Sequence, residues 1–410
     1  MALHATGGLE RLGHDPVRVV DFEADYLSQV PGFSTLSAYL SKPLIDQATV
    51  WNKAWQHFAK SLSTEGITLL LLHGTLVRDY YGVRIGINVQ RVVDDFKPTL
   101  IVTLVDDIYR LWARTQARAE GSLAVGMPNF EHLLMARRAE AMVGDNVQRA
   151  LADKNVSARH VFLAVNHPRH VLTKLISSNE PVVYLSFPIT APRELRAAGT
   201  EHAVSADATF GGINTFHRAG LRSQLGDAGF VCVSPLAIDE LPFALAAKAA
   251  ARRGEEAFAF DEASARWPLQ AIWHEADLLG TPCEAPKRGF PTQEVLGVVP
   301  MISSDVGWRD YRLVLQAKSI ACYSPVMPRP DGGWRLANGV KAELEKAAES
   351  FISCVVFQEP KFDPQRVWDS WLGTPGSMGS STRNVYIQAV TSVGAVFEVL
   401  RKQQKLGGRR

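Results

Sequence analysis

The sequence lacks the marks of membrane-spanning, secreted and zinc-binding proteins. Its longest apolar runs, such as residues 67–72 and 99–105, fall far short of the roughly 20 residues that a membrane-spanning helix needs. The first sixteen residues contain no apolar stretch typical of a secretory signal, which predicts a cytoplasmic location. Only four of the 410 residues are cysteine, and none pairs with a histidine at zinc-site spacing. We therefore expect buried, reduced thiols and no bound metal.

Several catalytic signatures are also missing. The chain has no G-x-x-x-x-G-K-[ST] phosphate loop, no H-E-x-x-H zinc motif and no G-x-S-x-G nucleophile elbow. The loop after the apolar run 67–72 reads His73-Gly74-Thr75-Leu76, without a phosphate-binding lysine, which disfavours a kinase. A formal net charge of +2 gives no support to general nucleic-acid binding. No motif calls for a cofactor, so none is expected.

The sequence does contain a repeated alternation of short apolar runs and amphipathic segments. Such an alternation predicts an α/β fold, here with two successive Rossmann-like parallel-sheet units. The expected strands are 67–72, 99–105, 158–165, 182–187, 230–233, the run IACYSPV, and 354–358 as the last. Amphipathic helices are expected at 130–142, 214–228 and 385–402, a loop at 188–199, and a strand or apolar connector at 295–301.

Four intervals follow from this pattern. Residues 1–48 form an N-terminal extension, and residues 49–180 form an α/β domain with at most a degenerate nucleotide-binding site. Residues 181–365 form a second α/β domain. Residues 366–410 form a Gly/Ser-containing loop and the C-terminal helix.

Residues 310–349 carry the most informative pattern. Asp310 is expected to begin and cap a helix, which leads to the strand IACYSPV and a Pro/Gly-rich loop, and Gly339 then opens another helix. A glycine lets a ligand approach the backbone, and the free N–H groups of a helix start attract anions. Glu343 is expected in the exposed first turn, beside that ligand. A glutamate in the first turn also stabilises a helix through its interaction with the helix dipole, but this effect alone does not predict the glycine four residues earlier.

This pattern resembles the nucleoside 2-deoxyribosyltransferase-like family, including its nucleotide N-glycosidase branch, over about residues 181–360. A segment reading Gly-Val/Thr-x-x-Glu-Ile/Leu carries the nucleophile of that family, and Glu343 matches it. The resemblance implies that Asp310 helps to bind or protonate the substrate. The family often has Asp or Ser six residues before the glutamate, where Ala337 stands here, with Asn338 beside it as a substitute. This departure leaves open a domain that binds without catalysis.

Further binding candidates follow two other predicted strands, at the edge where parallel sheets bind ligands. Ser186 lies at the end of the strand 182–187, and Thr190 and Arg193 follow it. These residues have the groups to hold a phosphate or ribose hydroxyls, unless this is an ordinary loop with a surface arginine. Asp239 follows the strand 230–233, where it either reaches the cleft or caps the next helix.

An acidic pair, Asp106-Asp107, follows the strand 99–105. Such a pair can hold Mg²⁺ after a buried strand, but we favour a helix cap.

These residues predict a hydrolase or glycosyl transferase that cleaves the N-glycosidic bond of a nucleoside, nucleotide or dinucleotide. Glu343 is the expected nucleophile and Asp310 its helper, while Arg193 and the region of Asn338 and Gly339 hold phosphate. The alternative is a non-catalytic nucleotide sensor or a structural subunit of a larger assembly, of the kind found in antiphage defence. A nucleoside or nucleotide is the expected partner, and no membrane is; a homo-oligomer or a protein partner stays open.

Overall fold

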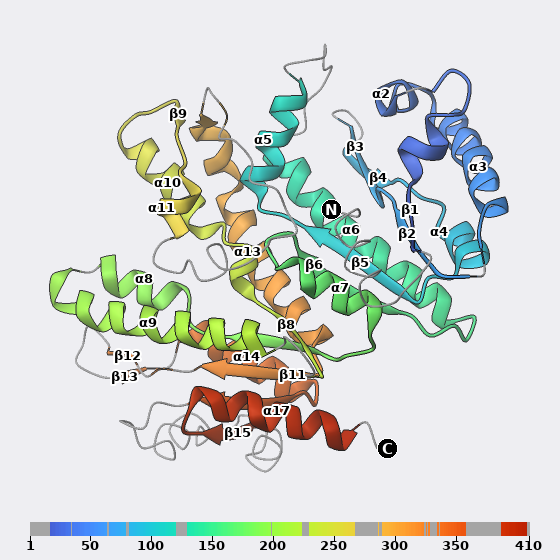
Figure 1. The fold of residues 1–410 in the computed structure, drawn as a ribbon. Helices are drawn as coiled ribbons and strands as arrows, with labels where there is room; N and C mark the ends of the chain where they lie inside the picture. The colour runs from blue at the N-terminus through green and yellow to red at the C-terminus, as the bar shows by residue number, and fades with distance from the viewer. Residues whose placement is uncertain are drawn as a thin grey trace. The chain divides into compact units, whose positions relative to one another are not determined.

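The chain forms two compact units in the computed structural model (Figure 1). The first unit comprises Met1–Val165, Glu240–Asp261 and Leu279–Asp305, and the second comprises Asn166–Asp239, Glu262–Leu278 and Val306–Arg410. The structure describes residues 17–33, 35–63, 65–78, 82–119, 129–197, 199–223, 229–266, 286, 289–323, 325, 327–328, 334–335, 337–357 and 387–407. The units differ from the expected intervals, because 240–261 and 279–305 join the first unit and 166–180 joins the second.

The strands of the first unit occur in pairs. Two pairs are parallel, β1 with β2 and β5 with β6, and two are antiparallel, β3 with β4 and β9 with β10. These strands are β1 (Val17–Asp21), β2 (Ile67–Leu71), β3 (Thr75–Arg78), β4 (Gly82–Ile85), β5 (Leu100–Val105), β6 (Arg159–Ala164), β9 (Ala257–Phe258) and β10 (Phe290–Pro291). The three strands expected in this part of the sequence are confirmed.

Helices surround these strand pairs. They are η1 (Glu23–Leu27), α2 (Leu36–Leu40), α3 (Leu44–Lys60), α4 (Val89–Arg91), η2 (Val92–Phe96), α5 (Ile108–Ala119), α6 (Phe130–Ala152), α10 (Leu241–Arg252) and the first part of α13 (Thr292–Gln316).

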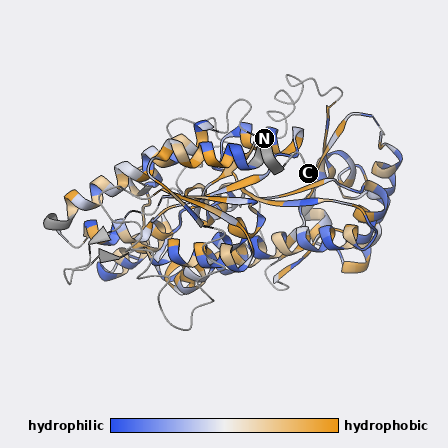
Figure 2. Cartoon of the chain, turned by 90° about the horizontal axis from the view of Figure 1, so that it is seen from below, coloured by the Kyte–Doolittle hydropathy of each residue, from blue (hydrophilic) through white to orange (hydrophobic). Residues whose placement is uncertain are grey.

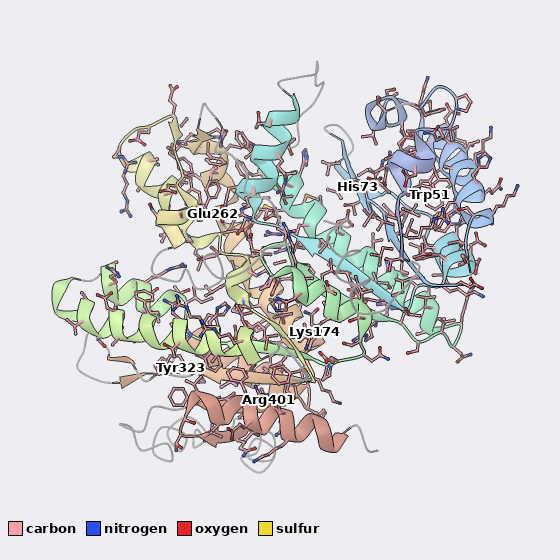
Figure 3. All side chains as sticks on the ribbon, viewed as in Figure 1. Trp51, His73, Lys174, Glu262, Tyr323 and Arg401 are labelled. Atoms are coloured by element: carbon pink, nitrogen blue, oxygen red, sulfur yellow. The ribbon has the colours of Figure 1, made fainter. Side chains whose placement is uncertain are left out.

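An aromatic core holds α3 in place. The rings of Trp51 and Trp55 stack with centroids 4.9 Å apart, and Phe22 and Phe58 complete the cluster (Figure 3 labels Trp51). Each aromatic side chain that leaves water here contributes about 2–3 kcal/mol to folding.

The second unit contains one five-stranded sheet in the order β15-β14-β11-β7-β8, and every neighbouring pair is parallel. Its strands are β7 (Val182–Ser186), β8 (Val231–Val233), β11 (Ser319–Tyr323), β14 (Ser353–Phe357) and β15 (Ile387–Val390). A short antiparallel pair lies outside this sheet, β12 (Met327–Pro328) with β13 (Trp334–Arg335). The expectation of an α/β fold with parallel sheets is confirmed.

Helices cover both faces of this sheet. They are α7 (Arg169–Ser177), α8 (Thr190–Ala197), α9 (Thr200–Ser223), η3 (Pro235–Ala237), α11 (Glu262–Arg266), the last part of α13, α14 (Asn338–Glu349) and α17 (Val393–Gly407). On one face, Phe216 of α9 packs against Phe397 of α17 and Tyr323 of β11. The opposite face receives α14. The strands are mostly apolar and the helices carry both kinds of residue (Figure 2), as a sheet covered on both faces requires.

Several expected elements are wrong in kind or extent. The expected loop 188–199 is largely α8. The expected strand or apolar connector at 295–301 lies inside α13, where Val295, Val298, Val299 and Ile302 are buried at helical spacing. Pro300 sits inside this helix and hides its continuity in the sequence. The strand at 354–358 is not the last, because β15 occupies the start of the expected C-terminal helix. Within the described residues, no helix is long and apolar enough to cross a membrane.

Candidate functional site

Two hydroxyl groups on β7 hold the carboxylate of Glu343. The Tyr184 hydroxyl donates to Oε1 over 2.8 Å, and the Ser186 hydroxyl donates to Oε2 over 2.5 Å. Tyr184 and Ser186 are two residues apart on the strand, so both side chains emerge on the face that α14 covers. Ser186 ends β7, which places the group at the carboxyl end of the sheet, where α/β folds bind ligands. The structure thus brings together Ser186 and Glu343, which are 157 residues apart in sequence.

Glu343 is not in the exposed first turn of its helix, so that expectation is wrong. The helix begins at Asn338, and Glu343 is 7% exposed in its second turn. The predicted start of the helix agrees with the structure, but the predicted exposed side of the helix does not. Val340, Leu344 and Ala347 define the buried face of the helix, and Glu343 lies within this face.

The surroundings of Glu343 make its charge costly. Burial, and then the nearby charge of Asp310, raise the pKa of the Glu343 carboxyl to about 8, although the bonds from Ser186 and Tyr184 and the charge of Arg309 oppose the rise. Burial, followed by the charge of Glu343, likewise raises the pKa of Tyr184 well above its usual range. A carboxyl with a strongly raised pKa, held by two donors at a sheet edge, is the kind of group found at functional sites.

Asp310 is near Glu343, but it does not begin or cap a helix. It lies well inside α13, which starts at Thr292, so the expected helix start is wrong. Its Oδ1 accepts hydrogen bonds from Nε and Nη2 of Arg309 over 3.1 and 2.9 Å. Arg309 is 3% exposed, so a buried guanidinium accompanies the two carboxylates.

Arg193 and Asp239 form an ion pair with each other. Nη1 and Nη2 of Arg193 reach Oδ1 and Oδ2 of Asp239 over 3.0 and 2.5 Å. Asp239 does not cap the following helix, since α10 takes Glu240 as its N-terminal flanking residue. In this bidentate pair, Asp239 occupies the two guanidinium nitrogens of Arg193 that a phosphate would need.

The other sequence candidates lie at helix starts. Thr190 is the exposed first residue of α8, and Asn338 and Gly339 are the exposed first two residues of α14. A Cβ added at Gly339 would meet no atom within 4 Å, so open space faces the helix start there. Ala337 precedes the helix and makes no side-chain cap.

Tyr184 and Arg309 belong to this group and are absent from the sequence prediction. Tyr184 has a detectable signal, because it precedes Ser186 by two residues in a strand and must share its face. Arg309 has no such signal, because the sequence predicts a helix start at its neighbour Asp310 and not a helix interior.

The acidic pair of the first unit is paired with arginines. Asp106 forms an ion pair with Arg114 and lies 3.9 Å from Nη1 of Arg110, and Asp107 directly precedes α5. Burial, then the charge of Asp107, raises the pKa of Asp106 to about 6. Among the residues described, no group of three or more His, Cys, Asp or Glu side chains is placed to hold a metal ion.

Comparison with protein-family models and with curated proteins gave no match for the chain.

Proposed function

We propose that the second unit cleaves the N-glycosidic bond of a nucleoside or nucleotide, with Glu343 as the nucleophile. The observation that carries the proposal is the carboxylate of Glu343, fixed by Tyr184 and Ser186 at the carboxyl end of a parallel sheet. The sequence resemblance adds the expectation of a glutamate nucleophile at this position.

In the proposed reaction an oxygen of Glu343 attacks the anomeric carbon of the ribose. The bond from this carbon to the base nitrogen breaks, the base leaves with a proton taken from water, and a glycosyl ester forms on Glu343. Water then hydrolyses the ester, which releases the sugar and restores the carboxyl group. Tyr184 and Ser186 keep the carboxylate aimed at one position, which lowers the entropy cost of the attack.

Asp310 and Arg309 set the electrostatics of this step. The charge of Asp310 raises the pKa of Glu343, so Glu343 is a stronger nucleophile once ionised. Arg309 balances the two carboxylates and prevents an uncompensated negative charge in the site. The exposed N–H groups at the start of α14 provide a position for phosphate.

The ion pair between Arg193 and Asp239 favours a second candidate, a non-catalytic nucleotide sensor. A phosphate that competes with Asp239 for Arg193 would release Asp239, and such an exchange reports ligand binding without chemistry. Ala337, which offers no acid for the leaving base, favours the same candidate.

Base release from a panel of nucleosides and nucleotides tests the first candidate. Glu343→Gln keeps the shape of the side chain but removes the nucleophile, so base release should fall by at least about 10³-fold. Glu345→Gln on the same helix is the matched control, because Glu345 is only in a loose, partly exposed pair with Lys341, and it should keep the parental rate. Equal rates in the parent and Glu343→Gln would refute catalysis by Glu343, and ligand binding without base release would support the sensor.

The pH dependence of the rate provides a second test. Only ionised Glu343 attacks, so kcat/KM should rise with pH through about 8, the pKa of this group. A rate that falls over this range would assign Glu343 as a proton donor instead.

A further inference from the structure

A second group of chemistry-bearing side chains lies in the first unit, far in sequence from Glu343. His160 of β6 contacts a hydroxyl through one ring nitrogen and a carboxylate through the other. Its Nε2 lies 2.8 Å from Oγ1 of Thr103 on β5, and its Nδ1 lies 2.8 Å from Oδ1 of Asp145 on α6. The side chain of His160 is 2% exposed.

In the neutral ring these contacts set the direction of both hydrogen bonds. A carboxylate only accepts, so Nδ1 of His160 carries a hydrogen, and in the neutral imidazole Nε2 then presents its lone pair. The Thr103 hydroxyl therefore donates to Nε2. A hydroxyl that donates to an imidazole, which in turn donates to a carboxylate, is the arrangement that activates a nucleophilic hydroxyl.

The residue beside Asp145 makes room for the imidazole. A Cβ added at Gly144 would lie 2.3 Å from Nε2 of His160, so a larger residue there would displace the ring. Gly144 and Asp145 thus seat the ring and orient it from adjacent positions on one helix.

Thr103 lines a cavity. The cavity has a volume of about 660 Å³, within the range of small-molecule sites, and Ile101, Leu104, Val143, Gly144 and Val147 are among its other walls. Its wall is mostly apolar and its charged groups are of both signs, acidic at Asp21, Glu23, Asp106 and Glu140 and basic at His73, Arg114 and Arg137, so it suits uncharged molecules.

A backbone donor lies at the open edge of β5. Arg159 N–H donates to the carbonyl of Thr99 and Val165 N–H donates to that of Val105, so odd-numbered residues of β5 point their polar groups at β6. In a parallel ladder the even-numbered residues then point to the opposite edge, which no described strand pairs with. The N–H of Leu104 is therefore directed at that edge, and the N–H of the residue after a nucleophile commonly stabilises an oxyanion.

We propose that Thr103, His160 and Asp145 form a second catalytic site, which hydrolyses uncharged carboxylic esters. Thr103 Oγ1 bonds to the ester carbonyl carbon while its proton passes to Nε2 of His160. The bond to the leaving alcohol breaks, and the alcohol takes that proton. Water attacks the acyl-threonine and gives a proton to His160, which returns it to Thr103 as the acid leaves.

Hydrolysis of p-nitrophenyl butyrate by the full chain tests this proposal. Thr103→Val should lower the rate by at least about 100-fold, while Thr103→Ser, which keeps the hydroxyl, should retain most of it. Thr115→Val is the control, because the hydroxyl of Thr115 donates only to its own helix, at Leu111 O, and it should leave the rate unchanged. An unchanged rate in Thr103→Val, or no hydrolysis above buffer in the parent, would overturn the proposal.

A fluorophosphonate probe tests whether Thr103 is a nucleophile if Thr103→Val does not fold. The oxygen of Thr103 should bond to phosphorus as fluoride leaves, and the proton leaves through His160. Peptide mass spectrometry of the parent should then place the phosphonyl group on Thr103. A probe that labels nothing, or labels another residue, would show that the three side chains form a structural network only.

Discussion

Removal of Arg137 should destabilise the first unit more than any surface change. Its side chain is 2% exposed, and its nitrogens contact Glu240 over 2.6 and 2.9 Å, the carbonyl of Asp106 over 3.1 Å, and Asp305. Glu240 and Asp305 are 0% and 1% exposed at their side chains. Arg137→Met would leave two buried carboxylates without their main counter-charge.

The size of this effect follows from what remains. Asp305 keeps Arg138, and Glu240 keeps one N–H donor, from Ile108 over 2.6 Å. Breaking a buried pair by removing one partner typically costs about 3–5 kcal/mol, which is a large part of the 5–15 kcal/mol that holds a typical domain folded.

Urea denaturation followed by tryptophan fluorescence measures this loss. The double variant Arg137→Met/Glu240→Gln should recover part of it, because the uncompensated charge is gone. Arg253→Met, which breaks an exposed pair with Glu255, is the control and should not shift the midpoint measurably. A loss below about 1 kcal/mol in Arg137→Met would refute the argument that this network is fully desolvated.

Three further predictions concern the second unit. Gly212→Ala should cost about 1–3 kcal/mol in urea denaturation, because its Cβ would lie 2.2 Å from a buried tyrosine hydroxyl, whereas Gly211→Ala, with no atom within 4 Å, should cost far less. Gly339→Ala should weaken nucleotide binding in calorimetry without loss of stability, and Gly394→Ala, at the matching position of α17 and equally open, should leave binding unchanged. The raised pKa of Glu343, about 8 against 4.5, means that the folded state retains a proton that the unfolded state releases, so stability should fall as pH rises from 5 to 8. The fall should be on the order of a few kcal/mol and absent in Glu343→Gln, and parallel pH curves for the two proteins would contradict the assignment.

Much of the fold was predictable because buried parallel strands have local runs of apolar residues in the sequence. Strands β2, β5, β6, β7, β11 and β14 all coincide with such runs, and the meeting of Ser186 with Glu343 follows from their positions at strand and helix ends. The apolar runs depend on sequence neighbours alone, whereas the contact between Ser186 and Glu343 joins residues 157 apart.

The rest depends on contacts between distant residues. Pro300 lies inside α13, so the sequence of this one helix resembles a connector followed by a second helix. For this reason the sequence predicts a helix start at Asp310. The pairing of Arg193 with Asp239, 46 residues away, is invisible in the sequence. Tyr184 and Glu343 can be read from the sequence, but their burial depends on how α14 is rotated against the sheet.

The most direct test of the account is to trap the reaction on Glu343. The protein is mixed with a nucleotide from which the panel detects base release, quenched in acid within the first turnover and digested for peptide mass spectrometry. A nucleophilic Glu343 predicts that the peptide containing it gains the mass of the sugar moiety, and that Glu343→Gln gains none. Base release by the parent without any adduct on Glu343 would contradict the account.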